Sequence, residues 1–322
     1  MKINFNTFKE GKIEGLVCVA NISEELTSVT GNKYVNVMFL GEEGSSKTAS
    51  LFYSKEEIEK AMPVKTVLNA EFCYKNGFIN MVKSTIVTNV TYKDFIVTTP
   101  MPPEVCIDRI IKTCEILKNS QYGNSSEYTT LYDLAKEVIL KNKEKILITP
   151  GSATNHHSYI GGLAYHIYKI MMISFKVLGI EGTDGNSVYD VDKEVVITSS
   201  ILCNINKIYT INSGELSFEN NDFYFLRNVC ELNVDIVDAV RMENNMIINS
   251  KKLEGLYICL RSFLGRRNWG AAINCVTEES YLVSLINEFD CNMSLYEKKK
   301  AQTPKGTISE YDNELHTRIY NI

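Results

Sequence analysis

The stretch NHHSYIGGLAYH (residues 155–166) gathers three of the four histidines of the chain into eleven residues. His166 shares a helical face with Leu163 and Ile170, so we expect its ring to point inward. A single histidine on an apolar face is usually a core residue. Clustered inward histidines instead indicate a metal site, because neutral imidazole is a common ligand. This stretch therefore predicts a helical domain with a histidine-lined site.

Helical periodicity continues on both sides of this stretch and fills the second half of the chain. Apolar residues recur at helix spacing over 105–119, 127–146, 155–178, 193–211, 234–243, 250–264 and 277–301. The segment TTPMPPEV (98–105) contains three of the six prolines, which makes it the best linker in the chain. We therefore expect a first domain over 1–97, a linker with connecting helices over 98–150, and a helical domain with a C-terminal tail over 151–322.

Residues 10–90 have the alternation and the β-branched and aromatic content of strands. The expected strands are 17–21, 33–40, 48–53, 66–74 and 78–87, with a turn at Asn76-Gly77 and a loop over 179–190 in the later half. A short helix over 54–62 follows the third strand, with Ser54 as its N-cap. Three strands, a helix and two strands is the order of an OB-fold, a small barrel that often binds oligonucleotides. The predicted fold class is α+β, with an OB-fold barrel followed by an all-α domain.

Composition and charge exclude several classes of protein. Hydrophobic residues make up 44% of the chain and charged residues 23%, as in globular proteins. No apolar run approaches the ~18 residues that a membrane span needs, and the N-terminus does not resemble a signal peptide, so we expect a cytoplasmic protein. The nine cysteines form no CxxC pair and indicate reduced, mostly buried thiols. The net charge of −5 argues against a broad basic surface for duplex DNA, although it allows a local groove for single strands.

Aromatic and basic residues provide candidate nucleic-acid contacts. In the barrel, Phe39, Phe52 and Tyr53 could stack on bases, or each could belong to the core. In the helical half, Arg261, Arg266 and Arg267 with Trp269 form the densest basic-aromatic patch, although a solvated helix end would give the same pattern. The candidate nucleic-acid residues are Phe52, Tyr53, Lys207, Arg261, Arg266, Arg267 and Trp269.

TNHHSYIGGLAYH (154–166) resembles the segment that opens the catalytic domain of the YhaM family of 3'-to-5' exoribonucleases. The resemblance continues in ILCNINKIYTI (201–211), in FLGRRNWGA (263–271) and over residues 284–315. Proteins of that family join an N-terminal OB-fold to a C-terminal HD domain, a helical metal-dependent phosphohydrolase. The resemblance covers essentially the whole chain and implies the same two-domain architecture.

The resemblance also places the family's metal residues on this sequence, where most of them are replaced. The first motif retains His156, His157 and His166, and Lys207 closes the second motif. The His-Asp pair that names the HD domain corresponds to Cys203-Asn204. The later ligand positions fall at Asn228, Phe263, Leu264 and Asn287, with Asp290 one turn after the last of them.

These replacements predict a vestigial site without metal, cofactor or catalytic residues. A hydrolytic site needs anionic oxygens and imidazoles to hold cations and activate water, whereas asparagine offers only a neutral amide. Phe263 and Leu264 offer no ligand at all. Four cysteines near the former ligand positions could bind zinc together with His166, but their spacing matches no zinc motif and buried cysteine is a common core residue. These cysteines are Cys203, Cys230, Cys259 and Cys291.

Three functions fit the sequence. We favour a catalytically inactive relative that binds single-stranded RNA or DNA, or a protein partner, in a regulatory or inhibitory role. The second is an exoribonuclease with an altered manganese or other divalent-metal site, formed by His156, His157, His166, Cys203 and Asp290. The third is an oligomeric interaction protein that reuses the fold, and a homo-oligomer would suit it. None of the three involves a membrane.

Overall fold

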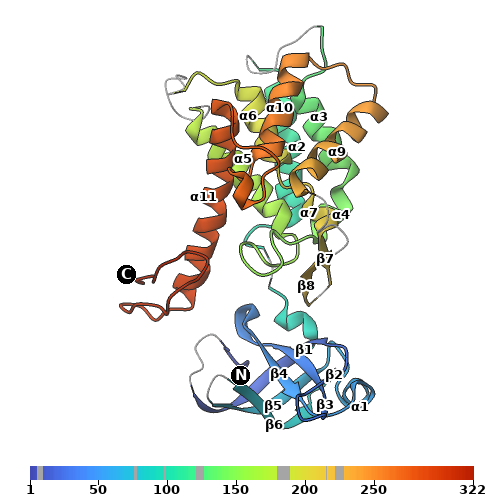
Figure 1. Cartoon of the computed structure of the whole chain (residues 1–322), viewed down its shortest axis with the longest axis vertical. Coiled ribbons are helices and arrows are strands. Elements are labelled where there is room, and N and C mark those ends of the chain that lie inside the picture. Colours follow the sequence, from blue (N-terminus) through green and yellow to red (C-terminus); the bar gives the residue numbers. More distant parts are fainter. Residues whose placement is uncertain are drawn as a thin grey trace. The chain divides into compact units, whose positions relative to one another are not determined.

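The computed structural model describes residues 1–5, 10–75, 78–97, 99–120, 127–179, 189–214, 216–221 and 228–322. An antiparallel sheet lies in the N-terminal part, and helices make up most of the rest of the chain (Figure 1). The chain forms two compact units. The first contains Met1–Val97, Gly214–Ser217 and Lys299–Ile322, and the second contains Thr98–Ser213 and Phe218–Lys298. The predicted mixed α+β architecture is confirmed.

The first unit is built on one antiparallel sheet. Its strands are β1 (Gly11–Ile22), β2 (Leu26–Thr27), β3 (Lys33–Leu40), β4 (Ser46–Leu51), β5 (Val67–Lys75) and β6 (Phe78–Ile86). The order is β2-β3-β1-β5-β6, and β4 also pairs with β3. Alternation along β3 buries Val35, Val37 and Phe39 on one face. Phe39 packs edge-on against Phe72 of β5 at 5.1 Å between ring centroids, so this face forms the core of the unit.

Short helices connect or follow the strands of the first unit. α1 (Lys55–Ala61) begins at Ser54, the predicted N-cap, whose hydroxyl accepts from the Glu57 amide in a capping box. The 3-10 turns η1 (Glu42–Gly44) and η2 (Tyr92–Phe95) join the remaining segments. The strand predicted over 48–53 ends at Leu51 and leaves two exposed aromatic residues beyond it. The predicted turn at Asn76-Gly77 lies outside the described residues.

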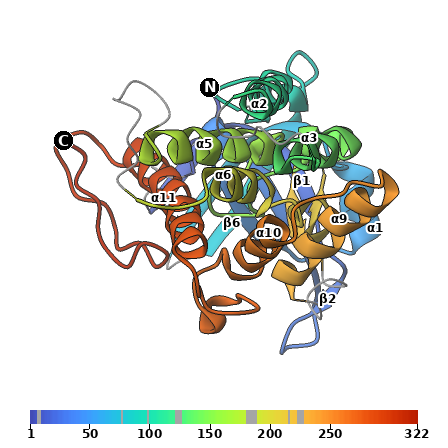
Figure 2. The ribbon, with the colours of Figure 1, turned by 90° about the horizontal axis from the view of Figure 1, so that it is seen from above.

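In its described residues, the second unit is helical apart from one short β-hairpin. Its helices are α2 (Pro103–Lys118), α3 (Leu131–Lys141), α4 (Lys143–Ile148), α5 (Gly162–Val177), α6 (Lys193–Leu202), α7 (Lys207–Thr210), α9 (Val229–Glu243), α10 (Ser250–Ser262) and α11 (Glu278–Ala301), the last three residues of which group with the first unit. The hairpin pairs β7 (Ile211–Ser213) with β8 (Phe218–Asn220), and η3 (Arg267–Trp269) follows α10. α6 is buried from Glu194 to Leu202 and packs against α3, α5 and α10 (Figure 2), so it is the central helix of the unit.

Three predicted helices are interrupted. The segment 127–146 divides at Asn142, and 193–211 ends its long helix at Leu202. The helix predicted over 155–178 begins only at Gly162, because His157 and Gly161 adopt left-handed φ values of 47° and 73°. Most of the predicted loop over 179–190 lies outside the described residues.

The two units also differ in extent from the domains expected from the sequence. The helices α2 and α3 do not form a separate connector, since their side chains share one apolar core with those of α5 and α6. Residues 299–322, expected to belong to the helical domain, group with the first unit. Among the described helices, none combines the length and the apolar character that crossing a membrane requires.

Candidate functional site

The loop before α5 delivers two histidines to the interior of the second unit. Gly161 adopts a left-handed conformation at the N-cap of α5, and Gly162 lies directly against the loop. A Cβ atom on Gly162 would lie 2.0 Å from the carbonyl oxygen of His157, so only glycine fits there. The amide of Gly151 donates to the same oxygen at 2.8 Å. The glycine pair thus fixes the backbone that carries His156 and His157.

Asp290 of α11 is the centre of a buried polar cluster. Its Oδ2 lies 2.7 Å from Nε2 of His157 and 2.7 Å from Nδ1 of His166. Its Oδ1 lies 2.9 Å from the Lys169 ammonium of α5. Burial alone would raise the pKa of Asp290, but the hydrogen bonds from the two histidines hold it well below its usual value. The carboxylate is therefore ionised and accepts from both rings.

The protonation of His166 follows from this contact. Burial and the nearby charge of Lys207 lower the pKa of His166 to about 4, so the ring is neutral near pH 7. Its one proton lies on Nδ1, which donates to Asp290, and Nε2 is left with its lone pair. Nε2 lies 3.2 Å from Oδ1 of Asn287. The Tyr159 hydroxyl, whose pKa burial raises, lies 2.8 Å from Nδ1 of His157 and completes the surroundings of that ring.

A chain of amides connects this cluster to the end of α6. Nδ2 of Asn204 donates to Oδ1 of Asn287 at 2.8 Å, and it also lies 3.2 Å from Sγ of Cys203. Asn233 of α9 donates to the Cys203 carbonyl at 2.6 Å and accepts from the Asn206 amide at 2.8 Å. These bonds fix the turn between α6 and α7, and that turn aims Asn204 into the cluster.

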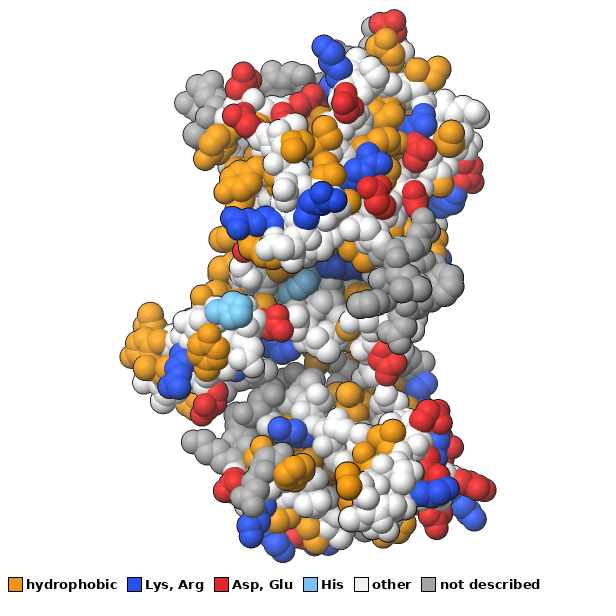
Figure 3. All heavy atoms as spheres, in the orientation of Figure 1, with side chains coloured by type: hydrophobic (Ala, Val, Ile, Leu, Met, Phe, Trp, Pro, Cys, Tyr) orange, Lys and Arg blue, Asp and Glu red, His pale blue; other side chains and the backbone are white. Residues whose placement is uncertain are grey.

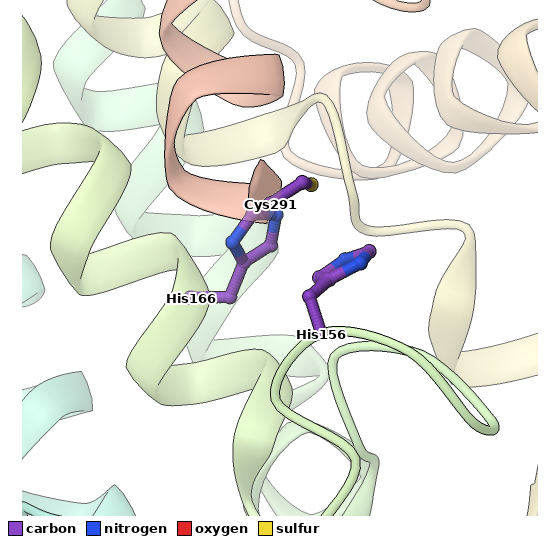
Figure 4. Close-up of side chains that lie close together, drawn as sticks. All are labelled: His156, His166 and Cys291. Carbon is purple, nitrogen blue, oxygen red and sulfur yellow. The ribbon is translucent and has the colours of Figure 1, made fainter. Parts of the chain in front are cut away.

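A second group of possible metal ligands lies beside Asp290. His156, His166 and Cys291 come from the preceding loop, α5 and α11, and each offers a ligand atom within 4.8 Å of the others (Figure 4). Burial raises the pKa of the Cys291 thiol to about 11. Nζ of Lys207 lies 3.1 Å from Nε2 of His156, and burial with this charge holds the pKa of His156 well below its usual value. Burial lowers the pKa of Lys207 itself, and its amino nitrogen already lies at the edge of this group.

The structure brings together eight of the residues proposed from the sequence. They are His156, His157, His166, Cys203, Asn204, Lys207, Asn287 and Asp290. The other three have structural roles. Asn228 is exposed and caps α9, and its side chain donates to the Gly270 carbonyl at 3.2 Å. Phe263 is buried in the apolar core, and Leu264 packs against that core.

Sequence reasoning missed two members of the cluster. Lys169 follows His166 by three residues, so helical spacing places both on one face of α5, and this signal was available. Tyr159 had no comparable signal, because its position depends on the irregular loop around His157.

Some of the candidate nucleic-acid contacts are exposed, and others are buried or paired with other side chains. Phe52 and Tyr53 are 61% and 60% exposed, whereas Phe39 is wholly buried. Phe52 lies 5.7 Å from the Tyr34 ring between centroids. A stacking role therefore stays open for Phe52 and Tyr53, whereas Phe39 belongs to the core.

On the second unit, the Arg266 guanidinium lies 4.9 Å from the centre of the Trp269 ring, which is 54% exposed. Arg267 is exposed beside them, whereas Nε of Arg261 lies 3.0 Å from each carboxylate oxygen of Glu231. Lys207 belongs to the interior cluster with His156. The free surface patch is therefore Arg266, Arg267 and Trp269.

The chain is similar to the 3'-5' exoribonuclease YhaM of Shouchella clausii (strain KSM-K16). The two are 18% identical over 315 residues, which cover 96% of this chain and 92% of that protein. No family model matches the chain, and no solved structure matches it. The similarity is weak, but it spans nearly the whole length of both chains and so supports a distant, YhaM-like relationship.

Proposed function

We propose that this protein is a catalytically inactive relative of YhaM that binds single-stranded RNA. In this proposal the sheet β1–β6 is an OB-fold and the helices α2–α11 form a degenerate HD domain. The order of the strands supports the first part. β1 pairs with β3 and β5, β3 pairs with β4, and β5 pairs with β6, with α1 between β4 and β5.

The main observation behind the proposal is that both carboxylate oxygens of Asp290 are already bound by side chains of the protein. Hydrolytic sites of one or two hard divalent cations use several anionic oxygens. Among the described residues of the cluster, Asp290 is the carboxylate bound to the histidines, and both its oxygens face protein cations or N–H donors. Asn204 and Asn287 contribute neutral amides, and the Asn204 amide donates a hydrogen bond to that of Asn287. This donor set does not fit the manganese centre that the resemblance implies.

Binding of single strands is supported by the exposed aromatic residues. Trp269 with Arg266, and Phe52 with Tyr34, present ring faces on which bases could stack. Arg267 adds a charge for phosphate. The similarity to an exoribonuclease over nearly the whole chain makes RNA the first ligand to test.

A second candidate is an exoribonuclease with an altered metal site. The close approach of His156, His166 and Cys291 favours it, because two imidazoles and a thiolate suit a zinc-like cation. The neutral ring of His166 donates through Nδ1 to Asp290, so Nε2 keeps the lone pair that would bind such a cation. This candidate needs Lys207 to move away from His156 when the cation binds.

Metal analysis of the purified full chain, paired with an RNA degradation assay in manganese or zinc, separates the two. The inactive relative should contain no stoichiometric metal, leave a labelled single-stranded RNA intact and bind it in a salt-sensitive manner. Stoichiometric metal together with shortening from the 3' end, both lost in His166→Ala, would establish the enzyme and overturn the proposal. A Trp269→Ala variant is the control for binding, because it alters the surface and leaves the interior cluster untouched.

A further inference from the structure

The outer face of α11 is a continuous apolar stripe. Its five large side chains are 39% to 59% exposed, although the opposite face of the helix is buried. They are Tyr281, Leu285, Phe289, Met293 and Tyr296. In Figure 3, hydrophobic side chains gather along the side of the second unit where Figure 1 shows α11. Scattered exposed apolar residues need no explanation, but a row of five on one helix is typical of an interaction surface.

The spacing of these residues matches the helical repeat, so their side chains lie on one face of α11. Tyr281, Leu285, Phe289 and Met293 recur every four residues, and Tyr296 falls on the same side. At 100° per residue the five side chains occupy about one third of the helix circumference, the width of a helix–helix contact. Asp290 and Asn287 lie on the opposite, buried face, where they form the interior cluster. One helix thus carries an interior site on one side and an exposed apolar face on the other.

Charges at the two ends of the stripe select the arrangement of a partner helix. Glu278 begins α11 and Lys300 lies near its end, and both are exposed on the side of the stripe. A parallel second copy would place Glu278 beside Glu278 and Lys300 beside Lys300, which is repulsive. An antiparallel copy would place each Glu278 beside the partner's Lys300. The face is therefore complementary to itself under a two-fold rotation, the commonest symmetry of homo-oligomers.

We propose that α11 forms an antiparallel homodimer interface, centred on Phe289, with a second copy of this chain. In this register Phe289 meets Phe289 across the two-fold axis, Leu285 meets Met293, and Tyr281 meets Tyr296. Partly exposed aromatic rings of this size bury on the order of 100 Å² each. The two stripes together would remove on the order of 1,000 Å² from water, which is about the least that a specific interface requires. This inference does not depend on the proposed function.

The test is the mass of the full chain in solution, measured by sedimentation or light scattering over a wide range of concentrations. The wild-type chain should be a dimer that dissociates on dilution. Phe289→Glu should raise the dissociation constant about 100-fold or more, because the change occurs twice at the centre of the interface. Phe78→Glu is the matched control, since Phe78 of β6 is 74% exposed and outside α11. A wild-type chain that stays monomeric throughout, or a Phe289→Glu chain that stays dimeric, would overturn the proposal.

Two further variants test the antiparallel arrangement. Glu278→Lys should weaken the dimer, and the double exchange Glu278→Lys with Lys300→Glu should restore it. Phe289→Cys should form an intermolecular disulfide in which mass spectrometry finds residue 289 linked to residue 289. A dimer of Phe289→Cys that yields only other linkages, or charge exchange without rescue, would contradict the two-fold axis. Circular dichroism of each variant establishes that it is folded.

Discussion

Lys169 and Asp290 form an ion pair between α5 and α11, with Nζ of the lysine 2.9 Å from Oδ1 of the carboxylate. The second oxygen of the same carboxylate accepts from His157 and His166. The group best placed to hold a divalent cation is therefore held by three side chains of the protein. The charge of this buried carboxylate is thus already balanced by side chains of the protein.

Asp290→Asn should lower the free energy of unfolding by about 3 kcal/mol, because it removes the partner of a mostly buried ammonium and of two buried rings. Chemical denaturation with urea measures the change. Asp108→Asn is the matched control, since Asp108 is 70% exposed and lies 3.7 Å from Lys143. That surface pair should contribute less than about 1 kcal/mol. An equal loss in the two variants would show that Asp290 does not anchor the cluster.

Stability should fall as the pH drops from about 6.5 to about 4. The folded-state pKa of His166 is lowered to about 4 by burial, whereas the unfolded chain takes up this proton near the ordinary value of 6.5. The unfolded state therefore binds more protons in this window, and the contribution of His166, on the order of 3 kcal/mol, is lost as the pH falls through it. Urea midpoints measured across the window record the slope. His166→Asn should reduce it, with the remainder coming from His156, whose pKa is also lowered, whereas the same change at the exposed His316 should leave it unchanged.

Cys203→His combined with Asn204→Asp should not create nuclease activity. Restoring this pair adds one imidazole and one carboxylate, but Asn287 still supplies a neutral amide and Asp290 stays paired with Lys169. The measurement is shortening of a labelled single-stranded RNA in manganese, with the wild-type chain alongside. The prediction fails if the double variant degrades RNA from its 3' end, and in that case two restored ligands suffice.

Trp269→Ala should weaken binding of a single-stranded oligoribonucleotide about tenfold or more, since stacking of one base contributes about 1–3 kcal/mol. Arg267→Ala should weaken it less and reduce the salt dependence by about one charge. Fluorescence anisotropy at several salt concentrations measures both effects. The comparison variant is Phe78→Ala, which removes an exposed ring from β6. Unchanged affinity in Trp269→Ala would exclude the surface patch from RNA binding.

Gly162→Ala should destabilise the protein by more than about 2 kcal/mol, because its Cβ would lie 2.0 Å from the His157 carbonyl oxygen. Gly255→Ala provides the contrast. Gly255 lies within α10, and a Cβ there would make ordinary contacts of 3.4 Å with Val195, so alanine should be neutral or stabilising by up to about 1 kcal/mol. Thermal melts of the two variants compare them directly. Similar melting temperatures would show that the histidine loop does not require glycine.

Much of the fold follows from periodicity. β3 and α10 lie close to the segments that alternation and helical spacing predicted, since each buries one face along a regular element. The predicted helix over 155–178 was wrong in its first turns, because the apolar spacing around Ile160 does not reveal the left-handed backbone at His157 and Gly161. Asn228 and Leu264 were placed in the site by correspondence alone, and the structure gives them capping and packing roles.

The sequence by itself determined the order of the main strands and helices and the inward direction of His166, because these depend on local spacing and on the identity of each side chain. Only the tertiary structure decided which side chains surround His157 and His166. Lys169, Tyr159 and Asp290 meet through the packing of α5 and α11 and the irregular loop before them. A hydrogen bond or ion pair acts over a few ångströms in space. Lys169 and Asp290 are 121 residues apart along the chain, so local sequence spacing does not reveal their contact.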